Sequence, residues 1–318
     1  MDLRQTLFTL AAEHGAPADA RLQRAAGLHG EPPSLAHTLP RAVLATGATL
    51  FGLGLVFWVA ANWDTLGRFG RLALLQGVVL GGVLMALWRP ALRVPGGLLA
   101  LLATGALFAT FGQTYQTGAD PWQLFALWAV LTLPLALAVR SDALWAPWAL
   151  VAMVAVSLWA QAHMGHRWRA DPDTLNLCLV AWTLTLALVA ALSPPLARFT
   201  GAGPWSFRLA LVLAVVAISG TALGALFSAQ VGAHFALGLA VLALMAGVLA
   251  LPRSFDVFGL SAAVLGLDTL LVCGLARWLF DDHRGGDAIG TLLVLGLAAA
   301  GLLAASVSGV LRLVRSRA

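Results

Sequence analysis

The chain has 318 residues, of which 60% are hydrophobic and 10% are charged, and its formal net charge at pH 7 is +5. A soluble domain carries about 25% charged residues, so the composition excludes a water-soluble globular protein. The basic residues are all arginine, and they flank apolar blocks instead of forming a basic stripe. This distribution excludes a nucleic-acid-binding surface.

The chain begins with a polar segment, residues 1–40, which we expect to form a short helical arm in the cytoplasm. Leu3, Leu7 and Leu10 recur at helical spacing and predict an amphipathic helix, and Pro17 can open a second helix. The favoured interpretation is a small helical hairpin packed under the membrane domain. In the alternative, the arm binds a partner or lies on the inner leaflet.

Residues 41–318 are expected to form the membrane domain. Their apolar blocks are about 17–24 residues long, the length that crosses a hydrocarbon core of about 30 Å as a helix. Lipid does not tolerate unpaired backbone groups, so the sequence predicts an all-α fold, a polytopic transmembrane helical bundle of about ten spans. The predicted spans are residues 42–61, 72–88, 94–112, 122–139, 143–162, 174–193, 209–228, 231–251, 257–276 and 288–311.

The arginine positions predict how these spans are oriented. Thirteen of the 19 arginines lie at one end of the predicted spans and six at the other. Basic residues in short loops mark the cytoplasmic side of a membrane. We therefore expect both termini to lie in the cytoplasm.

Asn62, Trp63 and Asp64 follow the first predicted span on the extracytoplasmic side. Trp63 is expected to be an interface anchor, Asn62 can cap the last carbonyl groups of the span, and Asp64 can pair with Arg68 or Arg71. In the alternative hypothesis, Asn62 and Asp64 join a polar cavity with residues of the turn after the third predicted span.

That turn, Gly112–Trp122, is unusually polar for this chain. A tight loop explains its glycine, aspartate and proline residues, and Trp122 is expected to be an interface anchor. A tight loop does not explain the two glutamines or the only tyrosine of the chain, so a ligand-contacting or packing-critical polar site is the alternative. The candidate residues of this extracytoplasmic cavity are Asn62, Asp64, Gln113, Tyr115, Gln116 and Asp120.

These motifs resemble a bacterial membrane protein family, the domain-of-unknown-function 2157 family. The similarity is carried by Gly112-Gln113-Thr114-Tyr115-Gln116, by Gly118-Ala119-Asp120, by Trp122–Trp128 and by Ala61-Asn62-Trp63-Asp64. It covers residues 1–160, the family-like part, and leaves residues 161–318 as additional spans. The resemblance implies a helical cytoplasmic arm and a location in the bacterial inner membrane, and it names no reaction, substrate or catalytic residue.

Two further places are candidates for chemistry. Asp268 lies in the middle of the ninth predicted span, where a carboxylate costs several kcal/mol unless it is paired, protonated or facing water. It is therefore a candidate intramembrane proton or ion site, with a structural hydrogen bond as the alternative. His163 and His166 are weak candidates for a zinc site, but arginines in the same loop oppose a cation. We expect no metal and no cofactor.

The leading hypothesis for function is a transporter-like or lipid-handling inner-membrane protein with an extracytoplasmic polar cavity. The alternative is a non-transporting membrane scaffold or sensor subunit that binds other envelope proteins. The sequence has no serine elbow, kinase-like loop or phosphate-cradling glycine pattern, so an enzyme is not favoured. The expected partners are the lipid bilayer and, in the alternative, other envelope proteins, but no nucleic acid.

Overall fold

The computed structural model describes residues 33–115, 118–164, 172–228, 232–252, 254–282 and 288–317. All regular secondary structure in these residues is helical, which confirms the predicted all-α fold. The helices of 17 residues or more are α3 (Pro33–Ala61), α4 (Trp63–Trp88), α5 (Arg93–Tyr115), α6 (Pro121–Val139), α7 (Asp142–Met164), α8 (Leu175–Ala191), α10 (Pro204–Leu226), α11 (Ala233–Leu249), α12 (Val257–Asp282) and α13 (Ala288–Arg315). Short connecting elements are η1 (Pro90–Leu92), η2 (Pro172–Thr174), η3 (Pro194–Leu196) and α9 (Ala197–Thr200).

The predicted amphipathic helix of the arm lies outside the described residues. Helix α3 begins at Pro33, so residues 33–41, which the sequence placed in the arm and its linker, continue directly into the helix of the first predicted span.

Seven of the described helices, α4, α5, α6, α7, α10, α12 and α13, are long and apolar enough to cross a membrane. Helix α8 and the segment Pro194–Thr200 form a pair bent by 56°, which makes an eighth span if the pair crosses as one unit. The protein is therefore a multi-span membrane protein.

The predicted count of ten spans is not supported. The apolar part of α3, Ala42–Trp58, and helix α11 each have at most 17 residues, and a 17-residue helix is about 26 Å long, which is short of a hydrocarbon core of about 30 Å. The predicted span 231–251 also counted residues beyond Leu249, where α11 ends. At α11, the apolar residues of the sequence did not reveal where the helix ends.

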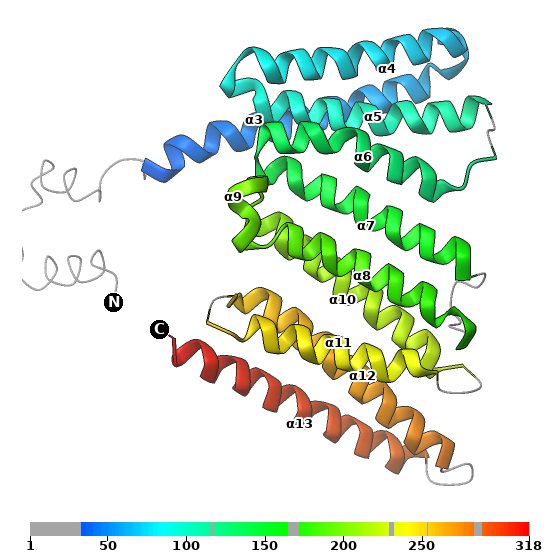
Figure 1. The fold of residues 1–318 in the computed structure, drawn as a ribbon, viewed down its shortest axis with the longest axis vertical. Helices are drawn as coiled ribbons and strands as arrows, with labels where there is room; N and C mark the ends of the chain where they lie inside the picture. The colour runs from blue at the N-terminus through cyan, green and yellow to red at the C-terminus, as the bar shows by residue number, and fades with distance from the viewer. Residues whose placement is uncertain are drawn as a thin grey trace, which may run out of the picture.

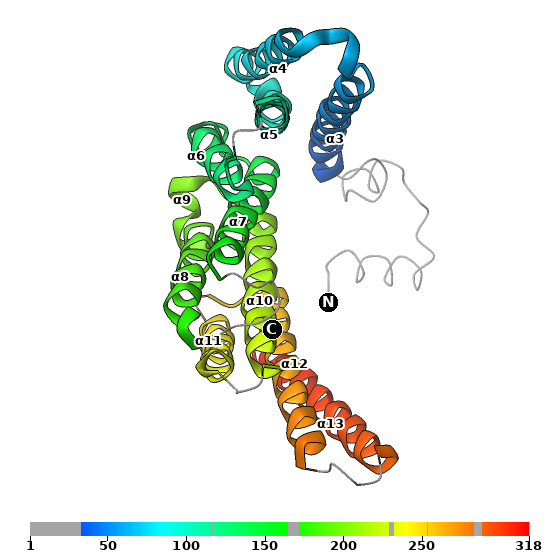
Figure 2. The same ribbon diagram turned by 90° about the vertical axis from the view of Figure 1, so that its right-hand side faces the viewer.

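Successive long helices run antiparallel and stand beside one another in a row (Figure 1). Viewed from the side, the row is curved, and in its middle α8 and α11 form a second layer beside α7, α10 and α12 (Figure 2). Helices α3 and α13 project to the same side near the two ends of the row. Helix α10 lies within the row and contacts α7, α8, α11 and α12.

The central position of α10 follows from its sequence. Ala210, Ala214, Ile218, Ala222 and Ala225 are fully buried, and their spacing of three or four residues places them on one face of the helix. Small side chains let helix backbones approach closely, and packing supplies the association energy in lipid, where hydrophobicity supplies little. Helix α10 can therefore pack against several neighbours at once.

Asp142 fixes the start of α10 against α7. Its carboxylate accepts hydrogen bonds from the backbone N–H groups of Gly203, Trp205 and Ser206, at 3.1, 2.9 and 2.8 Å. The first N–H groups of a helix have no partner within the helix, so a carboxylate from a neighbouring helix satisfies them. This contact sets the relative position of two helices that build the candidate site.

A second carboxylate, Asp256, joins α10 to the start of α12. The Arg208 guanidinium lies 2.7 Å from Asp256 Oδ1, and Asp256 Oδ2 accepts the N–H of Gly259. Burial raises the pKa of Asp256, but the hydrogen bonds from Arg208 and Gly259 and the charge of Arg208 outweigh it, so the pKa is lowered. The ionised form of Asp256 therefore stabilises the fold.

Candidate functional site

A cavity of about 490 Å³ lies between α7, α8 and α10, and we call it the α7–α8–α10 groove. Helix α7 lines it with residues between Met153 and Met164, α8 with residues between Ala181 and Thr185, and α10 with residues between Leu213 and Gly224. Its size falls within the range of about 300–1,000 Å³ that is typical of small-molecule sites.

The lining is mostly aliphatic, with a few hydroxyl and amide groups. Ser157 and Gln161 lie four residues apart on α7 and share one face of that helix. Thr185 of α8 donates its hydroxyl proton to its own helix, to the carbonyl oxygen of Ala181 at 2.7 Å. The groove therefore combines apolar surface with uncharged polar groups.

Trp182 and Thr221 link two walls of the groove. The Trp182 Nε1–H group donates a hydrogen bond to Thr221 Oγ1 at 3.0 Å, and Thr221 Oγ1 in turn lies 2.8 Å from the carbonyl oxygen of Ala217. A buried indole N–H needs a partner, so this pair fixes α8 against α10 and holds the Trp182 ring in the groove wall.

None of the described residues that line the groove is charged. Burying an unpaired ion in an apolar environment costs far more than burying a paired one, and the groove offers an ion no counter-charge. The lining is therefore suited to a molecule whose polar part is uncharged, and it is poorly suited to a small ion.

The groove opens on the outer surface of the helix bundle. Its walls include buried residues such as Met153, Ala181 and Trp182, whereas Val216 of α10 is 62% exposed. Gly220, one turn further along α10, is also exposed, and a Cβ atom added there would meet no atom within 4 Å. The mouth beside Val216 and Gly220 thus lies on a helix surface that faces lipid when α10 spans the bilayer.

None of the described residues of the predicted extracytoplasmic cavity lines this groove. Asn62 is half-buried, and its Nδ2 atom donates to the carbonyl oxygen of Trp58 at 2.9 Å, the capping contact that the sequence offered as its structural role. Gln113 and Asp120 are exposed at the end of α5 and just before α6. The side chains of Trp63 and Asp64, and all of Gln116, lie outside the described part of the structure.

Aromatic contacts gather at the same end of the bundle. The exposed ring of Tyr115 packs on Phe111, with ring centroids 4.8 Å apart. The Trp122 ring lies near His163, at 6.0 Å, and Trp159 contacts the same imidazole at 5.1 Å. The structure therefore brings together two predicted residues, Trp122 and His163, in an aromatic cluster.

His166 lies outside the described residues. Within the described residues, no three or more His, Cys, Asp or Glu side chains are grouped so that they could hold a metal ion.

Asp268 of α12 is buried, with 7% of its surface exposed, and it faces α13 instead of the groove. Ser306 Oγ donates a hydrogen bond to Asp268 Oδ1 at 3.0 Å, whereas Oδ2 is buried with no hydrogen-bond partner among the described residues. This hydrogen bond to a serine of a neighbouring helix agrees with the structural role that the sequence analysis gave as the alternative for Asp268. A proton or ion role for Asp268 stays a prediction.

The part of the bundle from α3 to the start of α7 resembles a known protein family. Residues 15–145 match the family described as predicted membrane protein (DUF2157). The match confirms the resemblance carried by the Gly112–Trp128 and Ala61–Asp64 motifs. The α7–α8–α10 groove lies beyond the DUF2157 region, so the family match does not describe it. No curated protein and no solved structure gives a significant match to the chain.

Sequence reasoning missed the groove residues Ser157, Gln161, Trp182, Thr185 and Thr221. One signal was present, because Ser157 and Gln161 form a polar pair at helical spacing within an otherwise apolar span. The residues of α8 and α10 carried no such signal, since only the packing of the three helices brings them together.

Proposed function

We propose that this membrane protein handles a lipid: it takes an amphiphilic molecule with an uncharged polar group from the bilayer into the α7–α8–α10 groove. The observation that carries the proposal is a cavity with an uncharged, largely aliphatic lining and a mouth beside exposed Val216. A molecule dissolved in the bilayer can reach such a mouth without passing through water.

The order of residues along α7 suggests how the molecule is oriented. Gln161 is exposed near the end of α7, and Met153 is buried eight residues earlier, which is about 12 Å deeper along the helix axis. A hydroxyl, ester or amide group of the ligand would hydrogen-bond with Gln161 and Ser157. Its hydrocarbon part would pack against Met153 and the aliphatic residues of α10.

The same features favour lipid handling over the transport of a water-soluble solute. A solute pathway through a membrane protein needs polar groups to replace the hydration shell. The hydroxyl groups of Thr185 and Thr221 in the groove already hydrogen-bond with carbonyl groups of their own helices, and the lining has no charge. The hydrocarbon part of a lipid needs only the aliphatic surface that the groove offers.

The test is a substitution that fills the groove without disturbing the backbone. Gly220→Phe adds an aromatic ring at the mouth, where a Cβ atom meets open space. Gly247→Phe is the matched control, because Gly247 of α11 also has no atom within 4 Å of an added Cβ and does not line the groove. Both variants are purified in mild detergent, and the lipids that remain bound are extracted and identified by mass spectrometry.

We expect a stoichiometric amphiphile in the unaltered protein and in Gly247→Phe, and a loss of at least tenfold in Gly220→Phe. Equal lipid content in all three proteins would contradict the proposal. A groove without any bound amphiphile would favour the alternative function, a scaffold or sensor subunit.

A further inference from the structure

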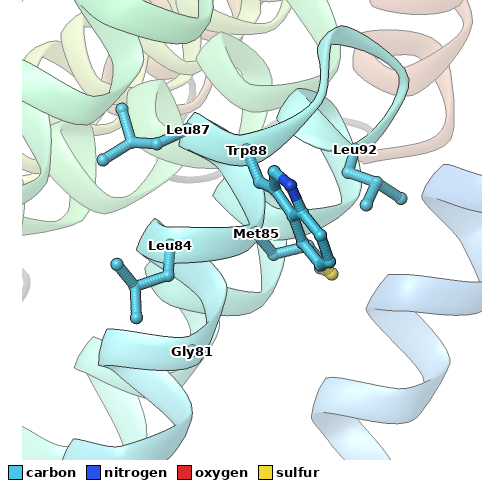
Figure 3. A pocket seen from close by; sticks show the side chains of 6 residues that line it. All are labelled: Gly81, Leu84, Met85, Leu87, Trp88 and Leu92. Atoms are coloured by element: carbon cyan, nitrogen blue, oxygen red, sulfur yellow. The ribbon is translucent and has the colours of Figure 1, made fainter.

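A second hollow, separate from the groove, lies at the end of α4. It has a volume of about 690 Å³ and is lined by Gly81, Leu84, Met85, Leu87, Trp88 and Leu92. Figure 3 shows the Trp88 indole beside Met85, with Leu92 nearby, while Leu84 and Leu87 project from the other side of α4. Trp88 is 76% exposed and Leu87 is 71% exposed. The hollow is thus an open apolar surface rather than a closed cavity.

Two arginines flank this apolar surface. Arg89 follows Trp88 directly, and its guanidinium carbon lies 5.3 Å from the centroid of the Trp88 ring. Arg93 follows Leu92 and begins α5. Both arginines are exposed, and neither forms an ion pair with a residue in the described part of the chain. Two positive charges therefore border the hollow, and no described residue forms an ion pair with either of them.

The local backbone explains this placement. Helix α4 ends at Trp88, and Arg89 has an extended conformation with φ −134° and ψ 139°. Pro90 then opens the short turn η1, where the absence of a proline N–H costs nothing. The extended backbone of Arg89 directs the chain away from the axis of α4. The three residues of η1 then separate Arg89 from Arg93.

We infer that the α4 hollow binds an anionic phospholipid. Its acyl chains lie against Met85, Trp88 and Leu92, which share one side of the hollow (Figure 3), and its phosphate pairs with Arg89 and Arg93. Tryptophan prefers the boundary between hydrocarbon and headgroups, and arginine is well suited to binding phosphate through two parallel N–H groups. An apolar surface bordered by two positive charges that form no ion pair with the described residues favours an anionic lipid over a neutral one. The inference does not depend on the α7–α8–α10 groove.

The experiment compares two lipids with identical acyl chains. The purified full-length protein in neutral detergent is titrated with phosphatidylglycerol or with phosphatidylcholine, and native mass spectrometry counts bound lipid. A third titration uses inorganic phosphate alone. The variant is Arg89→Gln with Arg93→Gln. The control is Arg312→Gln with Arg315→Gln, which removes the same charge from α13 at the same end of the bundle (Figure 1).

We expect phosphatidylglycerol to bind more tightly than phosphatidylcholine to the unaltered protein. The Arg89/Arg93 variant should weaken the binding of phosphatidylglycerol by about 25-fold, a factor of about five for each arginine near anionic headgroups, and should lose the preference. The Arg312/Arg315 control and the Gly220→Phe variant should keep the preference for phosphatidylglycerol. Equal affinity for both lipids, an equal loss in the control, or full competition by inorganic phosphate would overturn the inference.

A steric variant tests the apolar part of the site. Gly81→Phe places a ring in the hollow, where an added Cβ atom meets no atom within 4 Å. It should weaken the binding of both lipids by a similar factor of about ten, because the added ring obstructs their acyl chains, which are identical. Unchanged binding of both lipids by Gly81→Phe would show that they bind elsewhere.

Discussion

The contact between α4 and α5 gives a prediction whose size can be worked out from the structure. A Cβ atom added at Gly82 of α4 would lie 2.8 Å from the backbone nitrogen of Ala100 and 2.9 Å from the carbonyl oxygen of Gly96, both on α5. Ordinary contact begins at 3.4 Å, so Gly82→Ala requires the two backbones to separate by about 0.6 Å. Rigid backbone atoms, unlike the end of a flexible side chain, cannot move aside separately.

Overpacking of this kind costs about 1–3 kcal/mol, and the better helix propensity of alanine returns about 1 kcal/mol. Gly77→Ala is the matched control, because Gly77 lies in the same helix and has no atom within 4 Å of an added Cβ. The propensity gain is the same in both variants, so Gly82→Ala should be less stable than Gly77→Ala by about 1–3 kcal/mol.

The assay is reversible unfolding of the purified protein by sodium dodecyl sulfate, followed by circular dichroism and tryptophan fluorescence. Equal free energies of unfolding for Gly82→Ala and Gly77→Ala would refute the reasoning, since they would show that α4 and α5 are not in backbone contact at this position.

Three further predictions concern polar contacts. Asp142→Ala should destabilise the protein by about 1–2 kcal/mol in the same unfolding assay, because the start of α10 loses its cap. A loss of stability no larger than that caused by an alanine substitution at an exposed surface position would be inconsistent with three hydrogen bonds. Ser306→Ala should cost only about 0.6 kcal/mol, the average of hydrogen bonds between membrane helices, and Asp268→Asn should preserve that bond. Because the pKa of Asp256 is lowered in the folded state, its stabilisation should be full above its unfolded pKa near 3.8 and should fall as pH drops through the folded value. Melting curves of the unaltered protein should show this acid loss, and Asp256→Asn, which cannot form the ion pair with Arg208, should show less of it.

The fold was predictable because lipid leaves few choices for the backbone. Long apolar blocks had to be helices, and arginine positions and turn residues separated them. The span count failed at α3 and α11, whose apolar helical parts are at most 17 residues long. At α11, for example, the helix ends at Leu249 while the apolar residues continue to Leu251.

The candidate groove was less predictable. Asn62 was correctly given a capping role, because a cap depends on neighbours in the sequence. Trp182 and Thr221 meet across 39 residues of chain, and no local pattern reports such a contact. Polar residues at the Gly112–Trp122 turn attracted attention because they are rare here, but rarity does not establish a shared cavity.

The central claim is that the α7–α8–α10 groove is filled from the bilayer and not from water. The most direct test places a nitroxide label at Ser157→Cys, in a protein whose two free cysteines, Cys178 and Cys273, are replaced by alanine. Collision of the label with oxygen, which concentrates in lipid, is compared with collision with a water-soluble nickel chelate, and a label at exposed Leu244 of α11 gives the lipid reference. The account predicts that the Ser157 label behaves like the Leu244 label, with oxygen dominating; dominant collision with nickel would show a water-filled pathway and would contradict it.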